Sequence, residues 1–414
     1  MNARGMMERT RLVLCRSIVP VLLLACLVGH GAPAAGESVF SSLGLGESSR
    51  PTTARGTALG GSGIALADSV SGSFLNPASA SLLRRLTISV VFSPELRYPD
   101  GLRGASKNWS SRLDAVEVIL PFPRSVALSA GLLLWGDMNS SAEWSGETSS
   151  EEFLGRYERE GGVFSFPCHL SVGFRNRLFV AGGADVVQIN SREIWEKDFH
   201  SADYQDSRDV LDGSFSGARP SFSILLRWPE KLTLGFILQG AADLDGSLTT
   251  EPMFGKEFKN DSSLHLPASY GAGLSFHPVP GWMFVVEGSR VSWGDLRIAD
   301  SSPLPDRLSR GFAVGLEKTS TRRAGTWVSR LPLRIGYRHE SQPFDWPEGE
   351  TVLSQMITLG TGFSLTEKTS RLDLAVAVGR IGDVSKNGVE ERVIRLRVSF
   401  TASERWQRKR QTHY

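Results

Sequence analysis

The chain has 414 residues, of which 41% are hydrophobic and 22% are charged, and its formal net charge is +2. This length allows one large domain or two to three ordinary ones. A charge so close to balance argues against a dedicated nucleic-acid-binding protein, which would carry a marked basic excess. Electrostatics therefore identifies no partner, and we expect no nucleic acid among the ligands.

The first 34 residues have the features of a secretory signal peptide. A basic beginning is followed by the apolar run Ser17–Val28, and Ala32-Pro33-Ala34 fits the small-residue cleavage pattern. The apolar run is shorter than the about 20 residues that a spanning helix needs, which disfavours a signal anchor. The stretch Leu23–Cys26 also resembles a lipoprotein box, so a lipid on Cys26 remains an alternative. The sequence predicts an exported chain with residues 1–34 as the signal.

Residues 35–85 form a segment that is rich in small residues and precedes the first predicted strand. It contains Gly60, Gly61 and Gly63, which permit backbone dihedral angles that other residues avoid. The sequence Asn76-Pro77-Ala78 follows, and an Asn-Pro pair predicts a turn. A compact, partly apolar piece of this kind can fold into the lumen of a barrel as a hatch. The alternative is a periplasmic extension that only leads into the first strand.

Alternation of apolar and polar side chains dominates the chain from residue 86 onwards. In Leu232–Leu238 every second residue is a large apolar one, and in Val393–Phe400 the apolar residues alternate with Arg395 and Arg397. Many of these segments are 10 to 13 residues long, which exceeds the usual soluble strand and suits a tilted strand that crosses a bilayer. We expect about fourteen strands, at 86–96, 111–121, 124–136, 163–174, 177–188, 216–228, 231–242, 266–277, 281–293, 310–318, 331–340, 353–365, 370–380 and 391–400.

The connections between these strands alternate in length. Short turns such as Pro121–Arg124 are followed by long polar stretches, and only Thr319–Arg330 is long where a short turn is due. Outer-membrane barrels have short periplasmic turns and long outer loops, so the pattern predicts an all-β fold, a transmembrane antiparallel β-barrel, over residues 86–400. A secreted sandwich or propeller is the alternative, but no blade-sized repeat is visible. The predicted outer loops include Gly136–Gly162, Ile189–Phe215 and Asp243–His265.

A closed barrel pairs every backbone polar group in lipid, so its outside can be apolar while its lumen stays polar. We therefore expect the charged residues on the polar strand faces to point inward: Glu117, Glu287, Arg334, Arg338, Asp373, Arg395 and Arg397. Tryptophans near strand ends would form interfacial girdles, and these are Trp135, Trp228, Trp282 and Trp293. Residues 401–414, after Phe400, form a basic tail that we expect in the periplasm.

Motifs for chemistry are scarce. The seven histidines show no metal-ligand spacing, so we expect neither a metal site nor a cofactor. The sequence Gly60-Gly61-Ser62-Gly63 is not the G-x-S-x-G of a serine nucleophile. Cys168 is the only cysteine outside the predicted signal and cannot form an internal disulfide. We expect that the protein is not an enzyme.

Three stretches resemble the long-chain fatty acid transporter superfamily of outer-membrane barrels. They are Ala54–Ser79 with its glycines and Asn76-Pro77-Ala78, Leu266–Asp295 with its Pro, Gly and Trp pattern, and Leu333–Leu365. The resemblance implies a fourteen-stranded barrel in the bacterial outer membrane, plugged by an N-terminal hatch. It also implies passage of hydrophobic compounds into the bilayer through a lateral gap in the wall.

The function that we expect is passive uptake of a hydrophobic small molecule, such as a fatty acid, with lateral release past the hatch. Its partners would be outer-membrane lipid and the hydrophobic ligand itself. The Asn-Pro-Ala motif is shared by related barrels that act as secretion shuttles, so the fold carries over better than transport does. The alternative is a non-transporting barrel that binds secreted or periplasmic proteins as a secretion-shuttle or assembly module.

Overall fold

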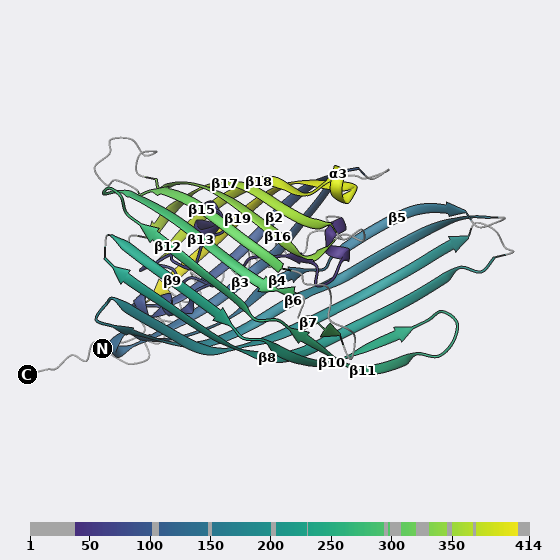
Figure 1. Cartoon of the computed structure of the whole chain (residues 1–414), viewed down its shortest axis with the longest axis horizontal. Helices are drawn as coiled ribbons and strands as arrows, with labels where there is room; N and C mark the ends of the chain where they lie inside the picture. Colours follow the sequence, from purple (N-terminus) through teal and green to yellow (C-terminus); the bar gives the residue numbers. More distant parts are fainter. Residues whose placement is uncertain are drawn as a thin grey trace, which may run out of the picture. The chain divides into compact units, whose positions relative to one another are not determined.

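A computed structural model describes residues 38–101, 107–147, 151–199, 204–229, 231–293, 297–298, 308–319, 331–345, 350–366 and 370–404 (Figure 1). All of them belong to one compact unit. The predicted signal peptide, the lipidation alternative at Cys26 and tail residues 405–414 lie outside the described residues. Across the described ranges, no helix is long and apolar enough to cross a membrane.

The fold is a closed antiparallel β-barrel of fourteen strands, which confirms the predicted fold class. The barrel closes where β19 pairs with β2. Four of the fourteen strands are interrupted, and each of these consists of two labelled segments. The pairs of segments are β4 and β5, β9 and β10, β11 and β12, and β13 and β14. Each of the fourteen predicted ranges coincides with one barrel strand. The strands are β2 (Leu86–Asp100), β3 (Asn108–Phe122), β4 (Val126–Asp137), β5 (Ser140–Glu147), β6 (Glu152–Phe174), β7 (Leu178–Phe199), β8 (Ser207–Trp228), β9 (Leu232–Gln239), β10 (Ala242–Glu251), β11 (Phe258–Leu266), β12 (Ser269–Phe276), β13 (Trp282–Ser292), β14 (Arg297–Ile298), β15 (Leu308–Lys318), β16 (Leu333–Asp345), β17 (Thr351–Thr366), β18 (Ser370–Asp383) and β19 (Val389–Glu404).

Several predicted outer loops are wrong, because the structure places strands there. Most of Gly136–Gly162, Ile189–Phe215 and Asp243–His265 belongs to β5, β6, β7, β8, β10 and β11. These strands continue past the rest of the barrel as a projecting sheet (Figure 1). The sequence hides this extension because polar residues occupy both faces of the sheet there, so the period-two contrast is lost. Of the predicted long connection Thr319–Arg330, the structure describes Thr319 alone. The strands on either side of this connection, β15 and β16, pair directly with each other.

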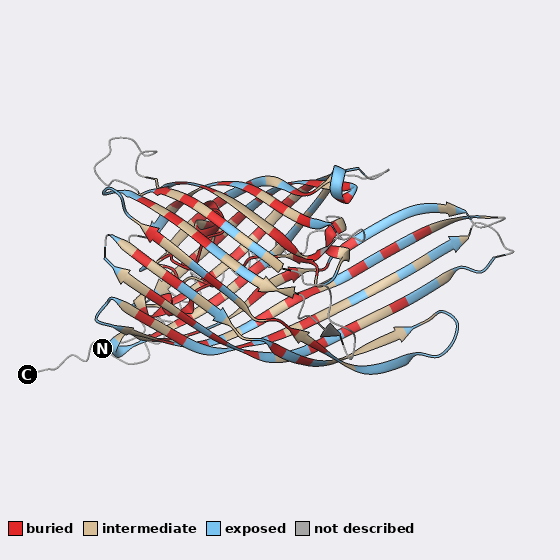
Figure 2. Ribbon diagram, viewed as in Figure 1, coloured by how far each residue is buried: buried red, intermediate tan, exposed pale blue. Residues whose placement is uncertain are grey.

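Burial alternates along the barrel strands (Figure 2), and large apolar side chains lie on the outside. Phe222, Ile357 and Leu359 are among the exposed large hydrophobics. Buried positions on the same strands hold serines, threonines, arginines and carboxylates. An apolar exterior around a polar interior is the arrangement that a barrel in lipid requires.

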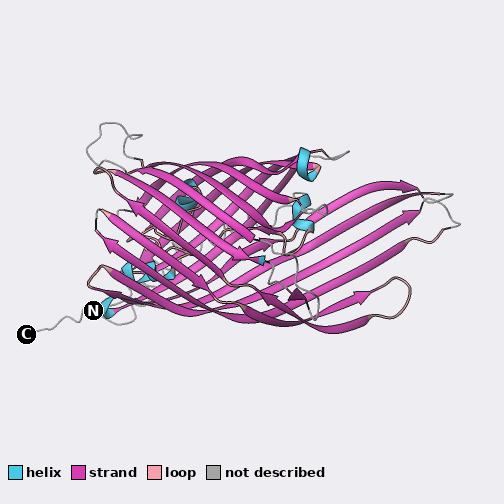
Figure 3. Ribbon diagram, viewed as in Figure 1, coloured by secondary structure: helices cyan, strands magenta, loops and turns pink. Residues whose placement is uncertain are grey.

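Residues 38–85 lie inside the barrel and carry the short helical turns seen among the strands in Figure 3. These turns are η1 (Val39–Ser42), α2 (Ala54–Ala58) and η2 (Pro77–Leu82), and the bridge β1 (Glu47–Ser48) lies between the first two. Helix α2 contacts β16 to β19, whereas η2 contacts β3, β4, β6, β7 and β8. The segment therefore touches separate parts of the wall and fills the lumen between them. The other helical turns are η3 (Pro123–Ser125) and α3 (Val384–Asn387), which connect wall strands.

Backbone-to-backbone packing between this lumen segment and the wall predicts a sensitive position. A Cβ atom added at Gly336 would lie 2.1 Å from the backbone nitrogen of Gly60. We expect Gly336→Ala to weaken the seating of the segment by roughly 1–3 kcal/mol, the usual cost of overpacking. Limited proteolysis should then cut residues 38–85 faster, while the folded barrel still shifts on a gel after heating.

Gly288→Ala is the matched control, since the nearest atom to its added Cβ is 3.9 Å away. Equal proteolysis of the Gly336→Ala and Gly288→Ala proteins would contradict close packing of the segment on β16.

Candidate ligand chamber and the segment that closes it

One wall carboxylate gathers the backbone of the lumen segment. Glu287 accepts hydrogen bonds from the backbone N–H groups of Gly63, Ile64 and Ala65, at 2.9, 2.7 and 3.0 Å. Arg50 of the same segment lies 3.3 Å from the Glu287 carboxylate, whose side chain has no exposed surface. Successive N–H groups that point at one anion form a concave nest. Glu287 thus fixes two separated parts of the segment to β13.

The predicted glycines lie where the segment meets the wall most closely. Gly60 and Gly61 have φ angles of 75° and 83°, which L side chains rarely adopt. A Cβ on Gly60 would lie 2.4 Å from the carbonyl oxygen of Tyr337, whereas one on Gly61 would contact the side chain of Arg338. Both the dihedral angles and the close approach to β16 therefore explain the need for glycine at this turn.

The predicted Asn76-Pro77-Ala78 motif joins the glycine turn to another wall strand. Asn76 is fully buried, and its Nδ2 donates to the carbonyl oxygens of Ile64 at 2.6 Å and Ile224 at 3.2 Å. Its Oδ1 accepts from the backbone N–H of Ala78 and caps η2, in which Pro77 takes the first position. The motif is thus a structural clamp between the segment and β8.

Arg395 and Arg397 lie on β19 and contact the lumen segment. Arg395 pairs with Glu47 of β1 at 3.0 Å. Arg397 donates to the hydroxyls of Thr52 and Thr57 at 3.1 and 3.0 Å and pairs with Asp114 of the wall. These two predicted residues therefore connect β19 with the segment before and within α2.

A second charge cluster holds Arg334 and Asp373, which form an ion pair at 2.8 Å. Asp68 of the lumen segment joins the cluster through Arg371 of β18 at 2.8 Å. Arg55 of the segment also pairs with Asp68, at 3.0 Å. Burial alone would raise the pKa of Asp68, but Arg371 and Arg55 outweigh it and hold the pKa below its ordinary value.

The two remaining predicted charges differ from the others. Arg338 pairs with Glu340 on its own strand. Glu117 is buried, and its Oε2 has no hydrogen-bond partner among the residues that the structure describes. The seven predicted charges therefore do not form one site, although all of them except Arg338 are classed as buried.

Sequence reasoning missed the partners that the segment itself contributes: Glu47, Arg50, Arg55 and Asp68. In the sequence these four are charged residues within a stretch that is rich in small residues. That pattern does not identify the residues with which they pair. The girdle assignment is wrong for Trp135 and Trp293, which line an internal cavity, whereas Trp228 and Trp282 are exposed at strand ends.

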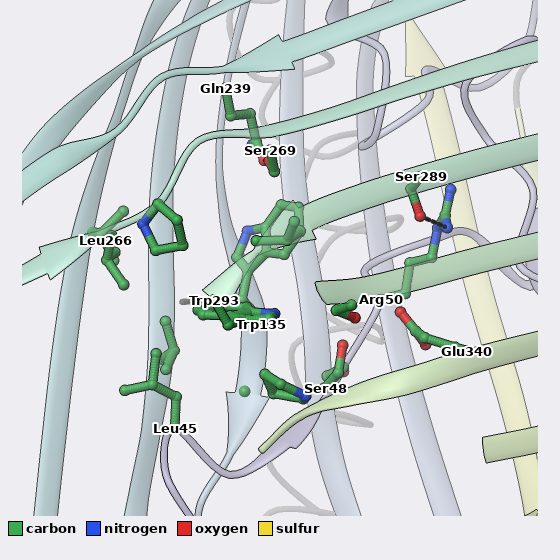
Figure 4. A pocket seen from close by; sticks show the side chains of 18 of the residues that line it. Leu45, Ser48, Arg50, Trp135, Gln239, Leu266, Ser269, Ser289, Trp293 and Glu340 are labelled. Carbon is green, nitrogen blue, oxygen red and sulfur yellow. Dashed lines mark hydrogen bonds between the residues drawn. The ribbon is translucent and has the colours of Figure 1, made fainter. Parts of the chain in front are cut away.

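This internal cavity, which we call the chamber, lies between the lumen segment and the inner wall (Figure 4). Its volume is about 140 Å³. Trp135, Trp293 and Leu266 form part of its apolar lining, and Arg50 and Arg219 add polar groups. The guanidinium of Arg219 lies 5.2 Å from the ring centre of Trp135. An apolar cavity with few polar groups is the usual form of a small-molecule site.

The wall is split beside this chamber. The hydrogen-bonded ladder between β3 and β4 begins where Phe122 pairs with Val126. It ends where Ala115 pairs with Leu133. Beyond that point β4 pairs instead with β1, Ser48 opposite Gly136. The N-terminal segment therefore occupies the edge of β4 that β3 leaves open. Ser48, Trp135 and Gly136 also line the chamber, so the split and the cavity adjoin.

Comparisons with known proteins agree with this architecture. A family model described as BamG matches residues 245–413, and no curated protein matches the chain. The CymD monoaromatic hydrocarbon channel superposes with a TM-score of 0.56 at 15% identity, over 85% of this chain and 97% of that channel. The toluene transporter TbuX of Ralstonia pickettii gives 0.55 at 14% identity, over 86% of this chain and 98% of that one. A Pseudomonas aeruginosa FadL homologue gives 0.57 at 11% identity, over 87% of this chain and 100% of that one.

The chain thus has the fold of bacterial outer-membrane channels, and the resemblance noted in its sequence agrees with these structures at the level of the fold.

The Glu287 nest can be tested directly. Glu287→Ala would leave Arg50 and the N–H groups of residues 63–65 buried without their anion. Removal of one partner of a buried ion pair costs about 3–5 kcal/mol, so we expect the segment to loosen. Hydrogen exchange at the amides of Gly63, Ile64 and Ala65 should become much faster.

Glu143→Ala is the control, because Glu143 pairs with Arg156 at the surface, where an ion pair contributes about 0–1 kcal/mol. Unchanged protection of residues 63–65 in the Glu287→Ala protein would show that the nest does not hold the segment.

Proposed function

We propose that the protein is an outer-membrane channel for passive uptake of hydrophobic small molecules, with lateral release past the N-terminal segment. One observation carries the proposal: an apolar chamber adjoins a split in the barrel wall at which β1 pairs with β4. The hydrocarbon and toluene channels with the same fold support it. Transfer of apolar surface out of water supplies about 25 cal/mol per Å², so uptake of an apolar molecule needs no other energy source.

The projecting sheet offers a path into the chamber. Tyr157 of β6 packs on Trp195 of β7 with ring centres 4.4 Å apart, and Trp144 of β5 contacts the same Trp195 ring. In the register of β6 and β7 these rings share a face with Val163 and Ile189. Those two residues belong to the apolar cluster beside the chamber. The Arg159–Glu193 ion pair lies on this face between the two groups, so the aromatic surface approaches the apolar cluster but is separated from it by one charged pair.

The proposed order of events follows from these contacts. A hydrophobic molecule such as an aromatic hydrocarbon or a fatty acid adsorbs on the aromatic face of the projecting sheet and moves into the chamber. Displacement of β1 from the edge of β4 then opens the split towards the bilayer. Trp135 and Gly136 lie on this route, because they line both the chamber and the split.

The BamG match supports a second candidate, a barrel that serves as an assembly or protein-binding module. The matched range, 245–413, includes β11, which pairs on the side away from β10 at residues 264–265 within the described part of the chain. Among the residues that the structure describes, the rest of this edge is unpaired and could accept a partner strand. A protein that is purified with a stoichiometric polypeptide partner, and without hydrophobic ligand, would favour this candidate.

Two neighbouring valines test the channel. Val187 lines the chamber, whereas Val186 points outward and is 47% exposed. Val187→Trp should fill the chamber and reduce uptake of a radiolabelled monoaromatic hydrocarbon by roughly tenfold, the effect of a loss of about 1.4 kcal/mol in binding.

Val186→Trp introduces the same side chain on the lipid side and should leave uptake as in the unchanged protein. Both variants should remain heat-modifiable barrels. Equal uptake by the two variants would contradict passage through the chamber.

A further inference from the structure

A second, smaller cavity adjoins the chamber. It has a volume of about 20 Å³ and shares Leu75, Ile237 and Gln239 with the chamber lining. Glu117 of β3, His169 of β6 and Asp185 of β7 also line it. The apolar chamber is therefore bordered by a cavity that carries two carboxyl groups.

One of these carboxyl groups already has a hydrogen-bond donor and a cation next to one of its oxygens. Asp185 accepts a hydrogen bond from Gln239 at 2.9 Å. The Nε2 of His169 lies 3.0 Å from Asp185, and Arg219 lies 3.5 Å from it. Asp185 thus has one hydrogen-bond donor and one guanidinium group beside it, although its Oδ1 and the Nε2 of His169 form no hydrogen bond among the described residues.

Glu117 differs from Asp185 in this respect. Only 6% of its surface is exposed, and its Oε2 is buried without a hydrogen-bond partner within the described part of the chain. The lumen segment approaches Oε2 at Gly72, where an added Cβ atom would lie 2.9 Å from this oxygen. Glycine has no side chain that could donate a hydrogen bond to it. A buried acceptor that lacks a donor is costly, and native proteins rarely keep one without a use.

We propose that the chamber favours apolar molecules that end in a hydrogen-bond donor, such as an alcohol, a phenol or an amine, and that Glu117 accepts that bond. This inference rests on the proposed channel function and specifies the chemical class of its substrate. The apolar body lies between Trp135 and Trp293, and the donor reaches past Leu75 into the smaller cavity. A carboxylate would bring a third acid to Glu117 and Asp185 and is disfavoured.

Four ligands with one aromatic ring test this selectivity: toluene, benzyl alcohol, benzylamine and benzoate. Equilibrium dialysis against the full barrel in amphipol measures the ratio of each affinity to that of toluene. We expect benzyl alcohol and benzylamine to bind roughly tenfold more tightly than toluene, and benzoate to bind more weakly.

Two substitutions separate charge from hydrogen bonding. Glu117→Leu removes the acceptor. The affinities of benzyl alcohol and benzylamine relative to that of toluene should therefore fall close to one. Glu117→Gln keeps an acceptor oxygen without charge, so the benzyl alcohol ratio should persist and the benzylamine ratio should fall. The control is Glu158→Leu, which removes an exposed carboxyl group from the projecting sheet and should change neither ratio.

The possible failures are distinguishable. Absence of toluene binding to the unchanged protein would refute the proposed channel function itself. Binding of toluene with ratios near one, unaffected by Glu117→Leu, would overturn only the role of Glu117 and leave it as a site for a water molecule. Tightest binding of benzoate would also overturn the inference.

Discussion

The structure depends on the pairing of charges between the lumen segment and the inner wall of the barrel. A barrel in lipid must turn its polar faces inward, and a lumen full of carboxylates and guanidinium groups is stable only if these groups are hydrogen-bonded and paired. Glu287, Arg395 and Arg397 receive partners from residues 47–65 rather than from water. The segment is thus part of the interior and not an appendage to it.

The chamber lies beside the places where this pairing is made. Arg50, which binds Glu287, also lines the chamber, and Ser48 of β1 does so too. The cavity is therefore bounded partly by the barrel wall and partly by a segment that is held in place by ion pairs, hydrogen bonds and close packing.

Much of the fold could be predicted because one physical signal covers it. Strands such as Leu232–Gln239 and Val389–Glu404 need an apolar lipid face and a polar lumen face, so their sequences alternate with period two. The projecting sheet could not be predicted in this way, since polar residues occupy both of its faces and remove the contrast. Trp135 and Trp293 were misassigned for a related reason: a tryptophan near a strand end can face lipid or a cavity, and only the register decides.

The candidate site was less predictable than the fold. The glycines at positions 60, 61 and 63 and Asn76 could be recognised as a special turn from their residue types alone. Their partners, such as the Glu287 carboxylate, lie more than 200 residues away in the chain. The split between β3 and β4 has no sequence signal, because it arises from where a third strand, β1, is added.

The most direct test of the account is a reversible lock on the lumen segment. A Cβ atom at Gly44 would lie 3.5 Å from that of Phe344 on β16, so Gly44→Cys with Phe344→Cys can form a disulfide in a Cys168→Ser background. The measurement is uptake of a radiolabelled monoaromatic hydrocarbon by cells that produce this variant, before and after reduction. The account predicts slow uptake in the oxidised protein and recovery when the disulfide is reduced. Equal uptake in both states, with the disulfide fully formed, would contradict a segment that must move for passage.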